Sequence, residues 1–373
     1  MTATDSVSLY ANTAHQTFRT TRIFGSLDGL RCLSILAVIW HHTANTSFEL
    51  PLAGRGHHGV TLFFAISGFL ITTLLIREKE RVGTISLKKF YIRRSLRIFP
   101  LYYAVLALYV ALVFAMESGT EAGATFRDNL VPYLTYTSNW FVDLKGERVI
   151  FYFAWSLATE EQFYLLWPYI QKRCKFWTPV WIMSALLVVA YLASDGYLGL
   201  ADGFFLTVLK SIMPGICLGA ILAHLLHHKR TFPAVLKVLG QRWSPPLFLV
   251  TLVAYCSLPT IHDWGVHAIG VLLVGSCVIR EDHFLKRPFN WSPIRWMGVI
   301  SYGMYMLHML AKNAFSTIAG KAGLSLEDST LGIHPAVLEF LGTTFIVVLA
   351  ATLSFKTFEA YFLKLKSRFS TTG

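Results

Sequence analysis

An arginine and a histidine lie in one apolar stretch, and their spacing could place both side chains in the same polar cavity. Arg31 and His42 are eleven positions apart within residues 27–44. On an α-helix this spacing returns to within about 20° of the same direction, with a rise of roughly 16 Å. His41 points about 80° away, so His42 is the better candidate for chemistry. The alternative is that one histidine hydrogen-bonds across helices and the other reaches the interface.

A second apolar stretch, near residues 150–170, contains two adjacent acids. Glu160 and Tyr164 are four positions apart and share one helical stripe, so we expect Glu160 to face the interior of a helix bundle. Two adjacent carboxylates cannot both face lipid. Glu161 is therefore expected either to be protonated or to pair with another helix, with Arg31 and Lys210 as the candidate partners.

A third apolar stretch carries a further histidine. Ser301, Tyr305 and His308 fall on one side of the helix expected over residues 298–316, since seven positions turn it to within about 20°. His308 either supports a reaction centre or is a satisfied packing histidine. In the stretch that begins at Gly59, Ser67 and Gly68 are small enough to let a neighbouring helix or a flexible ligand approach the backbone.

A basic amphipathic segment separates two of the apolar stretches. Residues 88–100 read KKFYIRRSLRIFP and include Arg93, Arg94 and Arg97. Such a segment can bind anionic lipid at the membrane surface. Arg94 and Arg97, three positions apart on a helix, could equally hold phosphates in a bidentate manner.

These side chains must be positioned by membrane helices. The chain has 373 residues, of which 54% are hydrophobic and only 14% charged. A hydrocarbon core of about 30 Å needs roughly 20 apolar residues per helix. We therefore predict an all-α, polytopic helix bundle of about ten transmembrane helices. The expected spans are residues 27–44, 59–76, 99–116, 150–170, 177–193, 204–226, 245–258, 265–279, 298–316 and 336–355.

The basic residues predict the orientation of the bundle. The net charge of +12 comes from Lys and Arg gathered in alternate connections, which fits the positive-inside rule with both termini in the cytosol and requires no nucleic acid. We expect a cytosolic tail over 1–26 without a signal peptide, a membrane domain over 27–358 and a basic cytosolic tail over 359–373. The five cysteines have no CxxC spacing and predict neither disulfides nor a metal site.

Six segments, in order along nearly the whole chain, resemble the membrane-bound acyltransferase 3 family of bacterial integral-membrane O-acyltransferases. They are LDGLRCLSILAVIWHH from Leu27, GVTLFFAISGFLIT from Gly59, RRSLRIFPLYY from Arg93, WSLATEEQFYLLWP from Trp155, MPGICLGAILA from Met213 and SYGMYMLH from Ser301. One departure is Thr61, where relatives often carry an acid.

The resemblance implies a multi-pass protein of the bacterial inner membrane that moves an acyl group, most simply acetyl, from cytosolic acyl-CoA to a hydroxyl of a glycan or glycolipid acceptor. The family's arginine-to-histidine motif falls on Arg31 and His42, and its RxxR motif on Arg94 and Arg97. Acetyl-CoA would be a co-substrate, with no permanent cofactor and no metal.

Together, the residues and the resemblance give one mechanism as an expectation. His42 would act as the general base, since an imidazole with a pKa near 6.5 can deprotonate a hydroxyl. Glu160 would orient it and Tyr164 would donate to the oxyanion. Other expected roles fall on further residues: Arg31 beside the donor, Arg93, Arg94, Arg97, Ser67 and Gly68 in donor binding, and Trp155, Tyr305 and His308 in acceptor binding.

A transporter is the alternative function. A proton-coupled transporter or flippase of an anionic or glycan solute also places His, Arg and Glu at mid-membrane. Consumption of the thioester separates the two functions, since a transporter moves solute without releasing CoA.

Overall fold

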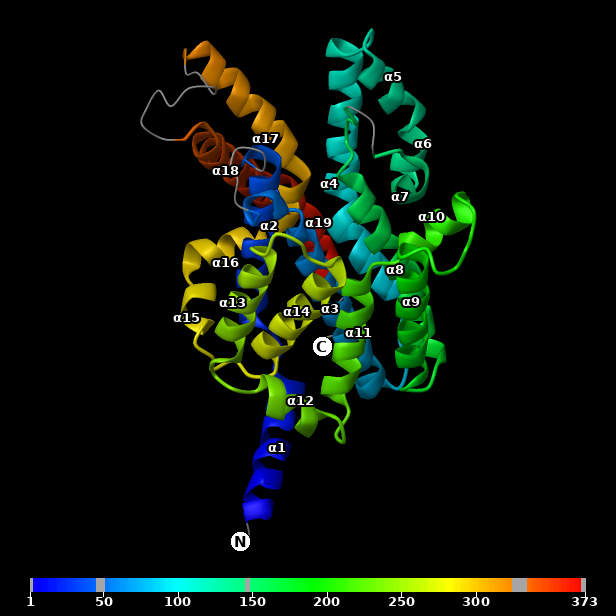
Figure 1. Ribbon diagram of the computed structural model, residues 1–373, viewed down its shortest axis with the longest axis vertical. Helices are drawn as coiled ribbons and strands as arrows, with labels where there is room; N and C mark the ends of the chain where they lie inside the picture. Colours follow the sequence, from blue (N-terminus) through cyan, green and yellow to red (C-terminus); the bar gives the residue numbers. More distant parts are fainter. Residues whose placement is uncertain (1–2, 45–50, 145–147, 324–333, 370–373) are drawn as a thin grey trace. The chain divides into compact units, whose positions relative to one another are not determined.

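The structure is a computed structural model, and it describes residues 3–44, 51–144, 148–323 and 334–369 (Figure 1). Every regular element within these ranges is a helix. The chain divides into two compact units. The first unit comprises residues 1–73 and 218–356, and the second comprises residues 74–217 and 357–373.

Helix α2 (Gly25–Ala44) is the central element of the first unit. Helices α14 to α18 and the short helix η1 (Ala53–Arg55) all contact it. The other helices of this unit are α1 (Ala3–Thr20), the first part of α3 (His58–Val82), most of α11 (Pro214–His227), α12 (Phe232–Leu239), α13 (Ser244–Cys256), α14 (Asp263–Val278), α15 (Lys286–Phe289), α16 (Ser292–Val299), α17 (Ser301–Lys321) and α18 (Pro335–Ser354).

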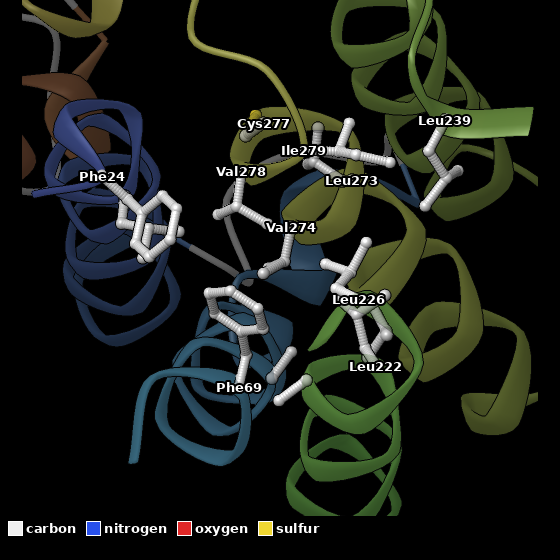
Figure 2. Close-up of a cluster of buried hydrophobic side chains, with 14 of the residues drawn as sticks. Phe24, Phe69, Leu222, Leu226, Leu239, Leu273, Val274, Cys277, Val278 and Ile279 are labelled. Carbon is white, nitrogen blue, oxygen red and sulfur yellow. The ribbon is translucent and has the colours of Figure 1, made fainter. Parts of the chain in front are cut away.

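An aliphatic core joins the helices of the first unit. Phe69 of α3 and Leu222 of α11 point toward Val274 of α14 in Figure 2. The polar helix α1 joins this core through Ala11 and Phe18, and Phe18 is 1% exposed with its ring 5.8 Å from that of Phe24. The hydrophobic effect therefore holds a helix that carries no long apolar run.

The second unit packs around aromatic side chains. Tyr102 of α4 (Leu87–Met116) is fully buried, and its hydroxyl donates to the carbonyl of Tyr133 at 2.7 Å. Phe151 packs edge-on against Tyr102, with ring centroids 5.7 Å apart. The other helices are the end of α3, α5 (Glu121–Asp128), α6 (Leu130–Leu134), α7 (Ser138–Phe141), α8 (Ala154–Arg173), α9 (Thr178–Ser194), α10 (Phe204–Lys210) and α19 (Ala360–Ser367).

Several helices are apolar enough for a bilayer, and the chain is a membrane protein. Among the described residues, three helices have the length and composition of a span, over His58–Val82, Leu87–Met116 and Pro335–Lys366. The number rises to five if two bent helix pairs each form one span. Each of the ten apolar stretches coincides with a helix or helix pair, while the total of ten spans and the side of each terminus stay predictions.

Candidate functional site

Two histidines from different helices meet in the first unit. His42, in the last turn of α2, stacks on His308 of α17 with ring centroids 5.0 Å apart and planes at 30°. His308 is 1% exposed, and its Nδ1 lies 2.6 Å from the carbonyl of Tyr305. Because a carbonyl can only accept, Nδ1 of His308 carries the hydrogen. The structure thus brings together three of the side chains that the sequence singled out.

A lysine that sequence reasoning missed reinforces this contact. Lys312 lies one turn after His308 on α17, and its ammonium donates to the backbone carbonyl of His42 at 2.5 Å. The same ammonium lies 3.9 Å from the carboxylate of Glu339 on α18. Lys312 therefore ties α2 to α17 and α18 and places a positive charge at the base of the His42 ring.

His41 belongs to the same cluster, contrary to the direction expected from the helix alone. Its ring lies 4.9 Å from that of His42 and 5.2 Å from that of His57. His57 in turn lies 4.1 Å from His58, whose Nε2 is 3.8 Å from a carboxylate oxygen of Asp263. The pairs at 41–42 and 57–58 therefore meet across two segments that are apart in sequence.

Two glycines allow this approach. A Cβ at Gly56 would lie 2.2 Å from the carbonyl oxygen of Ala37, and one at Gly59 would lie 2.3 Å from that of Ser34. Both distances are shorter than any real contact, so a side chain at either position would push the start of α3 away from α2. The absence of side chains at 56 and 59 brings the two histidine pairs together.

The remaining predicted residues of the first unit lie elsewhere. Arg31 is in the first half of α2, where its guanidinium donates to Asp28 at 3.0 Å. Ser67 is half-buried and Gly68 is buried in the middle of α3. Arg31 is thus engaged by an acid of its own helix, three turns from His42.

An apolar cavity of about 500 Å³ lies between α2, α3, η1 and α13. Trp40, His58 and Gly59 are among its lining residues. Arg55 also lines it and donates hydrogen bonds to three carbonyls at and after the end of α13, with distances of 2.6 to 2.9 Å. The α3 residues at this cavity are His58, Gly59 and Leu62, rather than Ser67 and Gly68.

The acids of α8 surround an arginine in the second unit. The guanidinium carbon of Arg94 lies 3.6 Å from the ring centroid of Tyr164. Its nitrogens lie 3.9 Å from Glu160 and 3.7 Å from Glu161. The cation beside Glu161 is thus Arg94 of α4, rather than Arg31 or Lys210. The spacing of Glu160 and Tyr164 on one face of α8 is what allows both to reach one guanidinium.

The other basic residues of α4 lie near the C-terminal helix. Arg93 pairs with Glu78 at 3.2 Å and donates to the carbonyl of Phe369 at 3.1 Å. Lys366 of α19 lies within electrostatic reach of Arg93, Arg94 and Arg97. Helices α4 and α19 therefore gather four cations in the second unit, and the contribution of Lys366 was absent from the sequence interpretation.

An amide pair beside the acids was also missed. Asn139 of α7 and Gln162 of α8 exchange hydrogen bonds at 3.0 and 2.8 Å, and Gln162 also donates to the carbonyl of Tyr136 at 2.9 Å. Trp155, one of the predicted acceptor-binding residues, is half-buried in the first turn of α8. The Asn139–Gln162 contact fixes one side of the helix that carries Glu160 and Glu161.

Outside the expected spans, desolvation and hydrogen bonds shift the pKa values of two ionisable groups. Partial desolvation lowers the pKa of His57, although the residue is exposed, and Asp263 opposes this effect. Hydrogen bonds from Arg148 and Thr120 lower the pKa of Glu117. Within the described ranges, no group of three His, Cys, Asp or Glu side chains is arranged to hold a metal ion.

Comparison with known proteins adds independent information. The chain is 28% identical to the peptidoglycan O-acetyltransferase OatA of Listeria monocytogenes over 369 residues, which cover 90% of this chain and 55% of that protein. It is also 28% identical over 331 residues to a Bacillus subtilis protein named "Putative peptidoglycan O-acetyltransferase YrhL", covering 80% of this chain and 49% of that protein. The chain spans about half the length of these curated relatives. No solved structure matches it.

A family model described as an acyltransferase domain matches residues 24–355. The match contains α2 with Arg31 and His42, the cations of α4, the acids of α8 and His308 of α17. It therefore covers most of the chain, including helices of both units. The chain belongs to the acyltransferase 3 family.

Proposed function

We propose that the protein is an integral-membrane O-acyltransferase that moves an acetyl group from acyl-CoA to a hydroxyl of a carbohydrate acceptor. The observation that carries this proposal is the contact of His42 with His308, two imidazoles held between apolar helices of an acyltransferase family. The names of the relatives support acetyl as the group and a glycan as the acceptor. We place the protein in the bacterial inner membrane with about ten spans and both termini in the cytosol.

His42 is the general base of the proposed reaction. Its imidazole takes the proton of the acceptor hydroxyl while the oxygen attacks the thioester carbonyl. The C–O bond forms, the C–S bond breaks, and the CoA thiolate leaves and takes up one proton. His308 carries its hydrogen on Nδ1, so its Nε2 side can share the positive charge that develops on His42.

The four cations of α4 and α19 form the proposed donor-binding site. Phosphates of CoA are anionic, and guanidinium groups bind them in bidentate fashion. Arg93, Arg97 and Lys366 supply charge, while Arg94 is positioned by Glu160, Glu161 and Tyr164. Glu160 and Tyr164 therefore act in the proposal through the guanidinium that they contact.

Other predicted residues have supporting roles in the proposal. Tyr305 lies against His308 with ring centroids 5.6 Å apart and forms a wall for the acceptor. Trp155 offers a ring face on which a sugar can stack. Arg31, held by Asp28, and the small residues Ser67 and Gly68 leave room for the pantetheine arm of the donor.

Purified protein in liposomes tests the function. Acetyl-CoA labelled in the acetyl group and peptidoglycan fragments are supplied, and release of free CoA is measured together with labelled ester. We expect both products in equal amount from the wild type and a loss of at least about 100-fold in His42→Ala. His262→Gln, an exposed histidine of the first unit, is the matched control and should retain the wild-type rate.

The outcome also separates the enzyme from a transporter. Solute movement across a sealed vesicle without CoA release would contradict the proposed function and favour the transporter. Full activity of a folded His42→Ala protein would exclude this side chain as the base.

A further inference from the structure

Four imidazoles form a continuous row in the first unit. Neighbouring ring centroids are 4.9 Å apart for His42 and His41, 5.2 Å for His41 and His57, and 4.1 Å for His57 and His58. The row ends at Asp263, whose carboxylate is 3.8 Å from Nε2 of His58 and whose side chain is 74% exposed. A line of titratable rings therefore runs from the stacked His42–His308 pair to an exposed acid, and His57 within this line is also exposed.

The ring nitrogens of this row are not all occupied by structural hydrogen bonds. Nδ1 of His41 is buried and has no hydrogen-bond partner among the described residues. The same is true of Nδ1 of His267, a 9% exposed residue one turn after Asp263 on α14. A purely structural histidine in an apolar setting would satisfy its nitrogens, because an unpaired buried polar group costs about 1–3 kcal/mol.

We propose that His41, His57 and His58 form a proton path between His42 and Asp263. This inference rests on the proposed function, since the proton in question is the one that His42 removes from the acceptor. The path carries that proton to water at the solvent-exposed end of the row, where His57 and Asp263 are both exposed. An imidazole can take a proton on one nitrogen and release one from the other, so successive rings pass a charge along without moving far.

The reaction balances when the proton released at Asp263 and the proton consumed at the donor site are both counted. At His42 the acceptor O–H bond breaks, the new C–O bond forms and the C–S bond of the thioester breaks. The proton leaves through the three histidines, and the CoA thiolate takes one proton from the water on the donor side. Each turnover therefore releases one proton at Asp263 and consumes one at the donor site, with no change in the total.

The charged groups beside the path favour transfer of the proton from His42 toward Asp263. The ammonium of Lys312 lies beside His42, so a second positive charge on the His42 ring is repelled toward His41. At the other end, Asp263 attracts positive charge to His58. The remaining titratable or charged groups near the path are Glu339 beside Lys312, His267, and Arg55 beside His57 and His58.

Sealed vesicles measure the direction of the proton. Acetyl-CoA added outside does not cross the bilayer, so only molecules with the donor site outward react with peptidoglycan fragments trapped inside. A trapped pH dye records protons, while released CoA and labelled ester are measured separately. For the wild type we expect about one proton to appear inside for each ester formed.

Variants of the middle rings supply the second readout. His57→Gln and His58→Gln should lower the turnover number about 10-fold or more, leave the KM for acetyl-CoA unchanged, and recover with added imidazole. His262→Gln, next to Asp263 and exposed, should behave as the wild type. Thermal unfolding of each variant shows whether the protein is folded. If a variant does not fold, the proton count of the wild type decides alone.

The possible results separate a failure of the proton path from a failure of the proposed function. Ester formation by the wild type without protons inside would overturn the path and leave the proposed function intact, as would full activity of folded His57→Gln and His58→Gln. Absence of any ester from the wild type would overturn the proposed function and the path together. One proton per ester, with rescue by imidazole, supports both.

Discussion

The rings of His42 and His308 stack with their centroids 5.0 Å apart, and they come from helices α2 and α17. Two protonated imidazoles at this separation repel each other. The pair therefore carries at most one positive charge at a time. Because Nδ1 of His308 is committed to the carbonyl of Tyr305, the ring orientation of His308 is fixed from its own helix.

Replacement of His308 tests this relationship. We expect His308→Gln to lower the turnover number about 100-fold while the KM for acetyl-CoA stays unchanged, because the ring supports the charge on His42 and does not touch the donor. Steady-state release of CoA measures both constants. Wild-type turnover in His308→Gln would show that the ring is only packed against His42.

The guanidinium of Arg94 is the second test. Arg94→Ala leaves Glu160 and Glu161 side by side without their cation, so we expect a loss of stability on the order of 2 kcal/mol. Addition of Glu161→Gln should restore part of it. Thermal unfolding in detergent gives the comparison. Arg173→Ala is the matched control, because Arg173 also lies over a tyrosine, Tyr169 at 5.5 Å, and is exposed.

Lys312 should act on the position of His42. We expect Lys312→Met to destabilise the protein by about 1–2 kcal/mol, since a charged hydrogen bond to a carbonyl is lost. The turnover number should fall as well. Lys321→Met, on the exposed end of the same helix, should change neither quantity. A Lys312→Met protein as stable as the wild type would contradict the importance of this bond.

The loop after α14 predicts a pH-dependent contribution to stability. Asp282 accepts hydrogen bonds from Arg280 at 2.6 Å and Arg242 at 3.0 Å, which hold its pKa well below its usual range. A lowered folded-state pKa stabilises the protein above the unfolded value of about 3.9 and loses this effect as the pH falls. Asp282→Asn should therefore be less stable than the wild type at pH 7.

The exposure of the Asp282 side chain sets the size of this contribution to stability. The side chain of Asp282 is 50% exposed, so we expect less than about 1 kcal/mol. The difference between wild type and Asp282→Asn in thermal unfolding should stay constant from pH 8 to about pH 5 and shrink below it. Asp202→Asn, at an exposed acid, is the control. A difference that grows on acidification would contradict the role of these bonds.

Hydropathy predicted the long helices because their apolar residues are continuous. The expected span at 27–44 became α2 (Gly25–Ala44), and the one at 336–355 became α18 (Pro335–Ser354). The polar stretch before residue 22 was assigned only as a tail, yet it contains α1. A helix whose buried side chains are the scattered residues Ala11, His15 and Phe18 leaves no apolar run to detect.

The site was predictable only within single helices. The helical repeat placed Glu160 and Tyr164 on one face of α8, and both contact Arg94. It could not name Arg94 as the partner of Glu161, because that contact joins residues far apart in sequence. The helical repeat also turned His41 away from His42, since it gives the direction of the Cβ atom and not the reach of the ring.

The close approach at Gly56 and Gly59 predicts a sequence pattern that can be looked for in related proteins. The two histidine pairs require two positions without side chains, and in this chain the second pair is bracketed by glycines as GHHG at 56–59. A descendant that lost either glycine would separate the pairs and relax selection on His41, His57 and His58, while His42 would stay under selection as the proposed base. Across the lineage, His41 and GHHG should therefore be inherited or lost as one unit.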